Sequence, residues 1–208
     1  MNDDAGTFEL ALFPLRMVLF PGGLLHLKVF EARYLDLVSR CLRDGSGFGV
    51  VCLREGGEVR SAGDAVRFED AGTQARIDEV DATQPGILQV RCRAQRRFAL
   101  AGPARQQADG LWTATVRWLA DEPEAAVPAA MRATAQALGN AIEALGAQGA
   151  RPVAEPYRLD DAGWVANRWC ELLPIPLGAK QRLMQLDDPL LRLKLVDEFL
   201  RQRGVVAG

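Results

Sequence analysis

The residues that most often perform enzyme chemistry are scarce and scattered in this 208-residue chain. His26 is its one histidine, which excludes a multi-histidine metal site. The four cysteines contain no Cys-x-x-Cys pair, and they are Cys41, Cys52, Cys92 and Cys170. Zinc sites and thioredoxin-type redox centres usually need such close pairs. We therefore expect no metal, no cofactor and no disulfide framework.

A glycine-rich run at residues 45–49 is the nearest approach to a phosphate-binding loop. It lacks the Gly-Lys-Ser/Thr ending whose lysine and hydroxyl meet the phosphates and magnesium. The run also follows a predicted helix and precedes a predicted strand, which reverses the order of a dinucleotide-binding motif. We interpret it as a turn.

Nucleophilic and acid–base catalysis have equally little support. In the alternating strand pattern at residues 25–29, His26 falls on the outward face together with Lys28. No serine or cysteine lies in a recognisable nucleophile elbow. The serines available for a Ser–Lys dyad, none in a convincing setting, are Ser39, Ser46 and Ser61. The carboxylate pairs 160–161 and 187–188 are better explained as helix N-caps. We predict that the chain is not an enzyme.

One segment is strongly basic. Its arginines fall within fifteen residues that contain no acid, and they are Arg91, Arg93, Arg96, Arg97 and Arg105. Arg91 and Arg93 share one strand face, opposite Val90 and Cys92. Since guanidinium groups match phosphate and carboxylate geometry, the first four arginines could form an anionic-ligand patch. An ordinary solvated strand face explains the same pattern, so both interpretations stay open.

The composition is that of a globular protein, with 49% apolar and 25% charged residues. A net charge of -2 argues against a nucleic-acid partner, which needs a basic surface. No apolar run approaches the ~18 residues that span a bilayer. The acidic start at residues 1–4 lacks the basic region of a secretory signal. We expect a reduced, cytoplasmic protein with no membrane partner.

Two kinds of pattern divide the chain. Alternating or continuous apolar runs predict strands near residues 8–12, 25–29, 48–53, 72–77, 87–94 and 111–118. Between them, one helical stripe occupies 34–42. Helical periodicity predicts further helices over 127–145, 161–173, 183–186 and 188–203. The acidic, proline-containing segment near 121–128 separates the two kinds. We predict an α+β protein with a strand-rich domain at 7–122 and a helical domain at 123–208.

Several spaced motifs with proline, glycine, glutamate and arginine at defined positions occur along the chain. The opening motif comprises Phe13-Pro14-Leu15, Val18 to Gly22, Leu27, Val29-Phe30-Glu31 and Arg33-Tyr34. The motifs continue at Phe48-Gly49-Val50, Gly72-Thr73, Ala75-Arg76-Ile77, Arg96-Arg97-Phe98, Glu171 to Pro174, Lys180-Gln181, Leu186 to Pro189 and Arg192-Leu193. Together these motifs extend over residues 8–203, nearly the whole chain, and they resemble the amino-terminal, substrate-binding domain of Lon proteases.

The resemblance implies a PUA-like β pseudo-barrel followed by a C-terminal α-helical bundle. It also implies a stand-alone member that lacks the ATPase and protease domains. On this basis we expect a non-catalytic module that binds polypeptide segments or acts as an adaptor in proteolysis or protein quality control. The partners would be unfolded or hydrophobic polypeptides, with a protease, a quality-control protein or a second copy of the chain also considered. The alternative is a PUA-like RNA-binding protein that uses the arginine-rich strand.

The motif residues divide into two candidate groups. The loop before the second strand holds more apolar residues than a turn requires, and exposed apolar surface containing methionine suits peptide binding. The polypeptide-binding candidates are Met17, Leu19, Phe20, Pro21 and Leu24. The same residues could instead plug the end of the barrel. The motif residues expected to be structural are Pro14, Glu31, Arg33 and Tyr34, with an ion pair or backbone anchor near the helix start.

Overall fold

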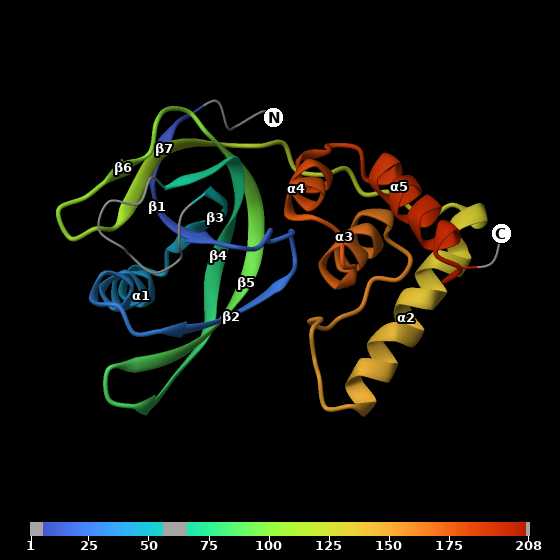
Figure 1. Cartoon of the computed structure of the whole chain (residues 1–208), viewed down its shortest axis with the longest axis horizontal. Coiled ribbons are helices and arrows are strands. Elements are labelled where there is room, and N and C mark those ends of the chain that lie inside the picture. Colours follow the sequence, from blue (N-terminus) through green and yellow to red (C-terminus); the bar gives the residue numbers. More distant parts are fainter. Residues whose placement is uncertain (1–5, 56–65, 207–208) are drawn as a thin grey trace. The chain divides into compact units, whose positions relative to one another are not determined.

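The computed structural model describes residues 6–55 and 66–206. The chain falls into two compact units, residues 1–120 and residues 121–208. In the described residues, the first unit contains the strands and one helix, and the second contains helices (Figure 1). This arrangement confirms the predicted α+β class.

The described strands of the first unit form one seven-stranded sheet in the order β2-β5-β4-β3-β1-β7-β6. They are β1 (Phe8–Leu15), β2 (Leu24–Val29), β3 (Gly47–Glu55), β4 (Arg67–Gln84), β5 (Ile87–Leu100), β6 (Arg105–Gln106) and β7 (Trp112–Trp118). A further pairing between β5 and β7 joins β5, β4, β3, β1 and β7 into a ring. The β1–β3 pair is parallel and the other pairs are antiparallel.

The helix α1 (Ala32–Asp44) separates β2 from β3 along the chain. Its buried face includes Tyr34, Leu37, Val38 and Cys41, as the helical stripe predicts. The helix ends at Gly45, whose φ of 63° is a left-handed conformation that glycine adopts without strain. The run at 45–49 is therefore a helix stop followed by a strand.

Apolar residues fill two cores in the first unit. One core includes the buried face of α1, with members from β1, β2 and β3 such as Phe13, Leu27 and Phe48. The other is centred on Phe98, Leu12 and neighbouring residues of β1, β3 and β7. Because β3 contributes to both cores, its central residues are buried on both faces, which explains its continuous apolar run.

Two strands are longer than their sequence patterns predict. β4 runs over residues 67–84 and β5 over 87–100, and the two form a long antiparallel hairpin. Their register shifts at three places, so the strict alternation that a sequence pattern needs is interrupted. The short strand β6 carries no periodic signal and was not predicted.

The second unit begins with a short 3-10 helix, η1 (Ala129–Met131). Its α-helices are α2 (Arg132–Ala147), α3 (Ala162–Leu172), α4 (Leu177–Gln185) and α5 (Pro189–Gln202). Two predicted N-caps are confirmed. The Asp161 carboxylate accepts from the Trp164 amide (3.1 Å), and the Asp188 carboxylate accepts from the Leu190 amide (2.9 Å). The fourth helix is longer than the predicted segment 183–186 and starts after Pro176.

Arg192 connects the parts of the second unit. Its buried guanidinium donates to the Leu183 carbonyl (2.7 Å), the Glu122 carboxylate (2.8 Å) and the Asn167 side chain (2.9 Å). It also donates to the Leu186 carbonyl. Glu122, the last residue of the strand-rich domain expected from the sequence, therefore packs with the helices. Across the described ranges, every helix falls short of the length and hydropathy that a membrane span requires.

Candidate functional site

The strand β2 lies at one end of the sheet order. It pairs with β5 and with no other strand in the described part of the chain. The Ala94 amide donates to the Gly23 carbonyl (2.9 Å), so the backbone of Gly23 faces β5. Successive residues of a strand direct their backbone groups to opposite edges. The register between residues 24–29 and β5 has no shift, so this alternation continues along β2. The N–H and C=O groups of Leu24, His26 and Lys28 therefore point away from β5.

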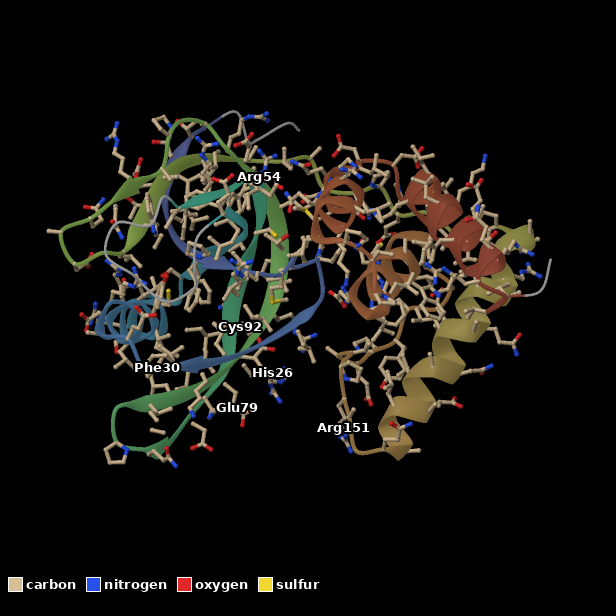
Figure 2. All side chains as sticks on the ribbon, viewed as in Figure 1. His26, Phe30, Arg54, Glu79, Cys92 and Arg151 are labelled. Carbon is tan, nitrogen blue, oxygen red and sulfur yellow. The ribbon has the colours of Figure 1, made fainter. Side chains whose placement is uncertain are left out.

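The side chains of β2 alternate as the sequence predicts. Leu25, Leu27 and Val29 are buried, whereas His26 and Lys28 are exposed. Figure 2 shows the labelled His26 and Glu79 side chains on β2 and β4, the strands that flank β5. The outward face of β2 thus carries two basic-type side chains and no carboxylate, and no described strand pairs with the edge of β2 opposite β5.

The loop that precedes β2 is anchored into the first unit. Thr73, itself buried, donates its hydroxyl to the Leu19 carbonyl (2.6 Å). Leu19 is 3% exposed and Phe20 is 0% exposed. Both side chains therefore fill the interior in this structure, which corresponds to the second interpretation of the loop, and their part in peptide binding stays a prediction. Their apolar character is explained by burial in the first unit.

The other candidates of this loop remain partly accessible. Met17, Pro21 and Leu24 are half-buried. Leu24 is also the first residue of β2, so it belongs to the edge strand itself. The accessible part of the candidate loop therefore adjoins the start of the β2 edge.

The arginine-rich strand does not present four free guanidinium groups. On β5, Arg91 pairs with Glu79 (2.9 Å) and Arg93 pairs with Asp78 (3.2 Å), both acids being on β4. Arg97 is only 3% exposed. These pairings were invisible in the sequence because the acids precede the arginines on a different strand.

The two remaining arginines of this group have structural contacts as well. The Arg97 guanidinium donates to the Ala120 carbonyl (3.0 Å). The Arg96 guanidinium lies over the Trp118 ring, 5.1 Å from its centroid. The predicted patch of Arg91, Arg93, Arg96 and Arg97 is therefore divided between ion pairs, a ring contact and a buried backbone anchor.

The motif residues near the start of α1 hold the first unit together. Arg33, which is 8% exposed, forms an ion pair with Glu31 (2.8 Å) and donates to the Gly110 carbonyl (2.8 Å). The neighbouring Tyr34 ring stacks on Phe13 with centroids 3.9 Å apart. Pro14 is buried in β1. Both the ion pair and the backbone anchor considered from the sequence are present, and the contacts are of a structural kind.

The candidate metal ligands and nucleophiles of the described residues have the following surroundings in the fold. Within residues 6–55 and 66–206, no cluster of three or more His, Cys, Asp and Glu could hold a metal ion. The four cysteines are buried as free thiols. Burial raises the pKa of the Cys92 and Cys170 thiols to about 12. Ser39 donates to the carbonyl of Leu35 in its own helix, and Ser61 lies outside the described residues.

The edge position of β2 was not predicted. Its sequence signal, an alternating run, shows that one face of the strand is buried. The same alternating run would occur in a central strand, because alternation shows which face of a strand is buried and does not show how many strands pair with it. Only the pairing of β2 with β5 alone places it at the edge.

Comparison with known proteins gives a consistent result. Residues 9–202 match the family model for the ATP-dependent protease La (LON) substrate-binding domain. A crystal structure of a Lon N-terminal domain protein from Xanthomonas campestris is similar, with 34% identity and a TM-score of 0.70. That match covers 91% of this chain and 96% of the other.

A more distant solved structure shares the fold. The N-terminal domain of Mycobacterium avium complex Lon protease has 15% identity and a TM-score of 0.56. The match covers 92% of this chain and 97% of that one. The search of curated proteins produced no match.

Proposed function

Because the chain belongs to the LON substrate-binding domain family, we propose that it is a non-catalytic module that binds segments of other polypeptides. The family match over residues 9–202 is the observation that carries this proposal. A role as an adaptor in proteolysis or protein quality control follows from the same premise. The four buried free thiols are in keeping with a reducing compartment such as the cytoplasm.

We place the binding surface at the free edge of β2. A strand with unpaired backbone groups is a template for an additional strand from another chain. Leu24, His26 and Lys28 would each offer one N–H donor and one C=O acceptor to an extended segment. At about 0.5–1.5 kcal/mol net for each hydrogen bond, strand addition would supply several kcal/mol without reading a particular sequence. Such tolerance suits a module that accepts many unfolded polypeptides.

The side chains of β2 add a preference to this backbone interaction. Residues directly opposite on neighbouring strands contact each other, and opposite charges there stabilise the pair. His26 and Lys28 are exposed on the outward face of β2. A bound segment with acidic or neutral residues on that face is therefore expected to bind better than one with lysine or arginine there.

RNA binding receives no comparable support. That alternative depended on a continuous basic face, and Arg91 and Arg93 each have a carboxylate partner on β4. Neutralised arginines release few counterions, so they contribute little to phosphate affinity. We therefore favour polypeptide binding.

A proline scan of β2 tests the proposal. The probe is fluorescein-labelled, reduced and carboxymethylated casein, whose anisotropy reports binding by the whole chain. His26→Pro removes an N–H that points away from β5 and leaves the β2–β5 hydrogen bonds in place, as edge strands tolerate. We expect His26→Pro to bind casein on the order of tenfold more weakly, because it loses a hydrogen bond and adds a steric block.

Two matched variants show whether weaker casein binding results from the change to the backbone of β2. His26→Ala keeps the backbone donor and should bind casein about as well as the natural chain. Leu27→Pro removes an N–H that faces β5, so it should lower the free energy of unfolding. Equal casein binding by His26→Pro and the natural chain would exclude the β2 edge. The absence of casein binding by the natural chain would refute polypeptide binding itself.

A further inference from the structure

A cavity of about 530 Å³ opens in the first unit among β1, α1 and the strands β4 and β5. Its size lies within the usual range of small-molecule sites. The polar side chains that line it include Glu9, Arg40, Ser46, Gln74, Arg76 and Gln95. These residues come from five separate elements or turns, so the fold alone brings them together.

Two guanidinium groups line this cavity from different elements. Arg40 lies on α1 and Arg76 on β4, and both side chains are exposed. Neither forms an ion pair with any residue in the described ranges, unlike Arg91 and Arg93 on the neighbouring strand. Unpaired arginines that share a concave surface are suited to an oxyanion, because guanidinium groups donate parallel hydrogen bonds to it.

The charge of the cavity indicates which oxyanion. Arg40 and Arg76 contribute two positive charges and Glu9 one negative charge, which leaves a net charge of one positive. Glu9 is also engaged elsewhere, since it accepts a hydrogen bond from the Thr115 hydroxyl (2.5 Å). A monoanionic carboxylate would balance this net charge, whereas a doubly charged phosphate would leave an excess negative charge in the cavity.

Apart from Thr113 and two glycines, the remaining lining residues are apolar. Phe8 and Ala11 of β1 border the cavity and are half-buried, while Leu37 and Cys41 of α1 lie behind its surface. Burial raises the pKa of the Cys41 thiol, so this residue stays neutral at pH 7. Apolar lining next to a pair of cationic groups suits a ligand that carries both an apolar group and a carboxylate.

We propose that this cavity, which we name the Arg40–Arg76 pocket, binds a monoanionic carboxylate attached to an apolar group. Two sources share this chemistry. One is a free carboxylic acid, and the other is the carboxyl-terminal residue of a polypeptide. The pocket does not include the β2 edge strand, and the proposal does not depend on strand addition there.

Three small probes distinguish the sources, each titrated into the 15N-labelled whole chain while the amide signals of Ser46 and Gly47 are followed by NMR. N-acetyl-L-phenylalanine represents a polypeptide end, and 4-phenylbutyrate represents a free acid. N-acetyl-L-phenylalaninamide lacks the carboxylate. We expect saturable shifts with at least one carboxylate and none with the amide. Binding of only the first carboxylate assigns the pocket to chain ends, and binding of only the second assigns it to free acids.

Arginine variants then test the assignment. Arg40→Gln and Arg76→Gln change exposed side chains, and each should weaken carboxylate binding on the order of tenfold. Arg43→Gln is the matched control, because Arg43 is on the same helix but outside the cavity lining and pairs with Asp44. It should bind as the natural chain does. The proposal is overturned if neither carboxylate shifts the signals at about 10 mM, which would saturate even a millimolar site. It is also overturned if the amide binds equally or if both pocket variants bind normally.

Discussion

Replacing Arg192 with methionine tests whether one buried guanidinium holds the second unit together. The side chain is 0% exposed and donates to two backbone carbonyls, to Asn167 and to the Glu122 carboxylate. Methionine preserves much of the volume but removes the guanidinium donor of all these hydrogen bonds. Glu122 is only 16% exposed, so its charge would remain poorly solvated.

The expected cost follows from these partners. Breaking a buried ion pair by removing one side costs about 3–5 kcal/mol, because the remaining charge is left uncompensated. Each unsatisfied buried acceptor adds to that penalty. We therefore expect Arg192→Met to lower the free energy of unfolding by about 3–5 kcal/mol, a large fraction of the 5–15 kcal/mol that is typical of a domain.

Urea denaturation followed by far-UV circular dichroism measures this loss, since the second unit is helical. Arg182→Met is the matched control, because Arg182 lies on α4 with its side chain exposed. It should change stability by less than about 0.5 kcal/mol. The double variant Arg192→Met with Glu122→Gln should recover part of the loss, because it also removes the half-buried charge that Arg192 balanced. A loss below about 1 kcal/mol for Arg192→Met would refute the reasoning.

Three further measurements test other parts of the structure. Burial raises the pKa of Glu171 from 4.5 to about 7, although the neighbouring Arg168 guanidinium lowers it. The Glu171 carboxyl therefore binds its proton more tightly in the folded chain than in the unfolded chain. The stability that this group contributes is therefore present below pH 4.5 and declines as the pH rises toward 7, by up to about 1.4 kcal/mol per pH unit. In urea titrations at several pH values, Glu171→Gln should reduce this dependence of the unfolding free energy on pH. Gly72→Ala would place a Cβ 2.2 Å from the Val50 carbonyl and should lower the melting temperature by the equivalent of about 1–3 kcal/mol, whereas Gly102→Ala, with open space, should not. The buried thiols should resist iodoacetamide at pH 8 in the native chain and react fully in urea, as mass spectrometry can count; rapid native labelling would contradict their burial.

Local sequence patterns were sufficient to predict a helix or strand wherever the segment has one buried face. The alternation of residues 25–29 predicted β2, and the stripe on residues 34–41 predicted α1. Asp161 and Asp188 were identifiable as caps because a short side chain meets amides only two or three residues away. The lengths of β4 and β5 were underestimated, since bulges interrupt their alternation.

The site residues were less predictable, for a reason shared by all of them. Leu19 and Phe20 are apolar whether they face a ligand or the interior, and only the packed structure shows that they are buried. Arg91 and Arg93 formed a basic cluster in the sequence, but their charge is balanced by acids from another strand. Arg40 and Arg76 were not among the predicted site residues, because a pocket built from α1 and β4 has no linear signature.

The sequence by itself determined the fold class, the family and the local elements, because hydrophobic periodicity, capping and spaced motifs act between residues that are near in the chain. Tertiary structure alone decided which strand lies at the edge, which arginines are neutralised and which remain available. Those properties depend on contacts between residues far apart in the chain, whose partners are chosen by strand pairing and packing. The two proposed surfaces, the β2 edge and the Arg40–Arg76 pocket, both belong to this second kind.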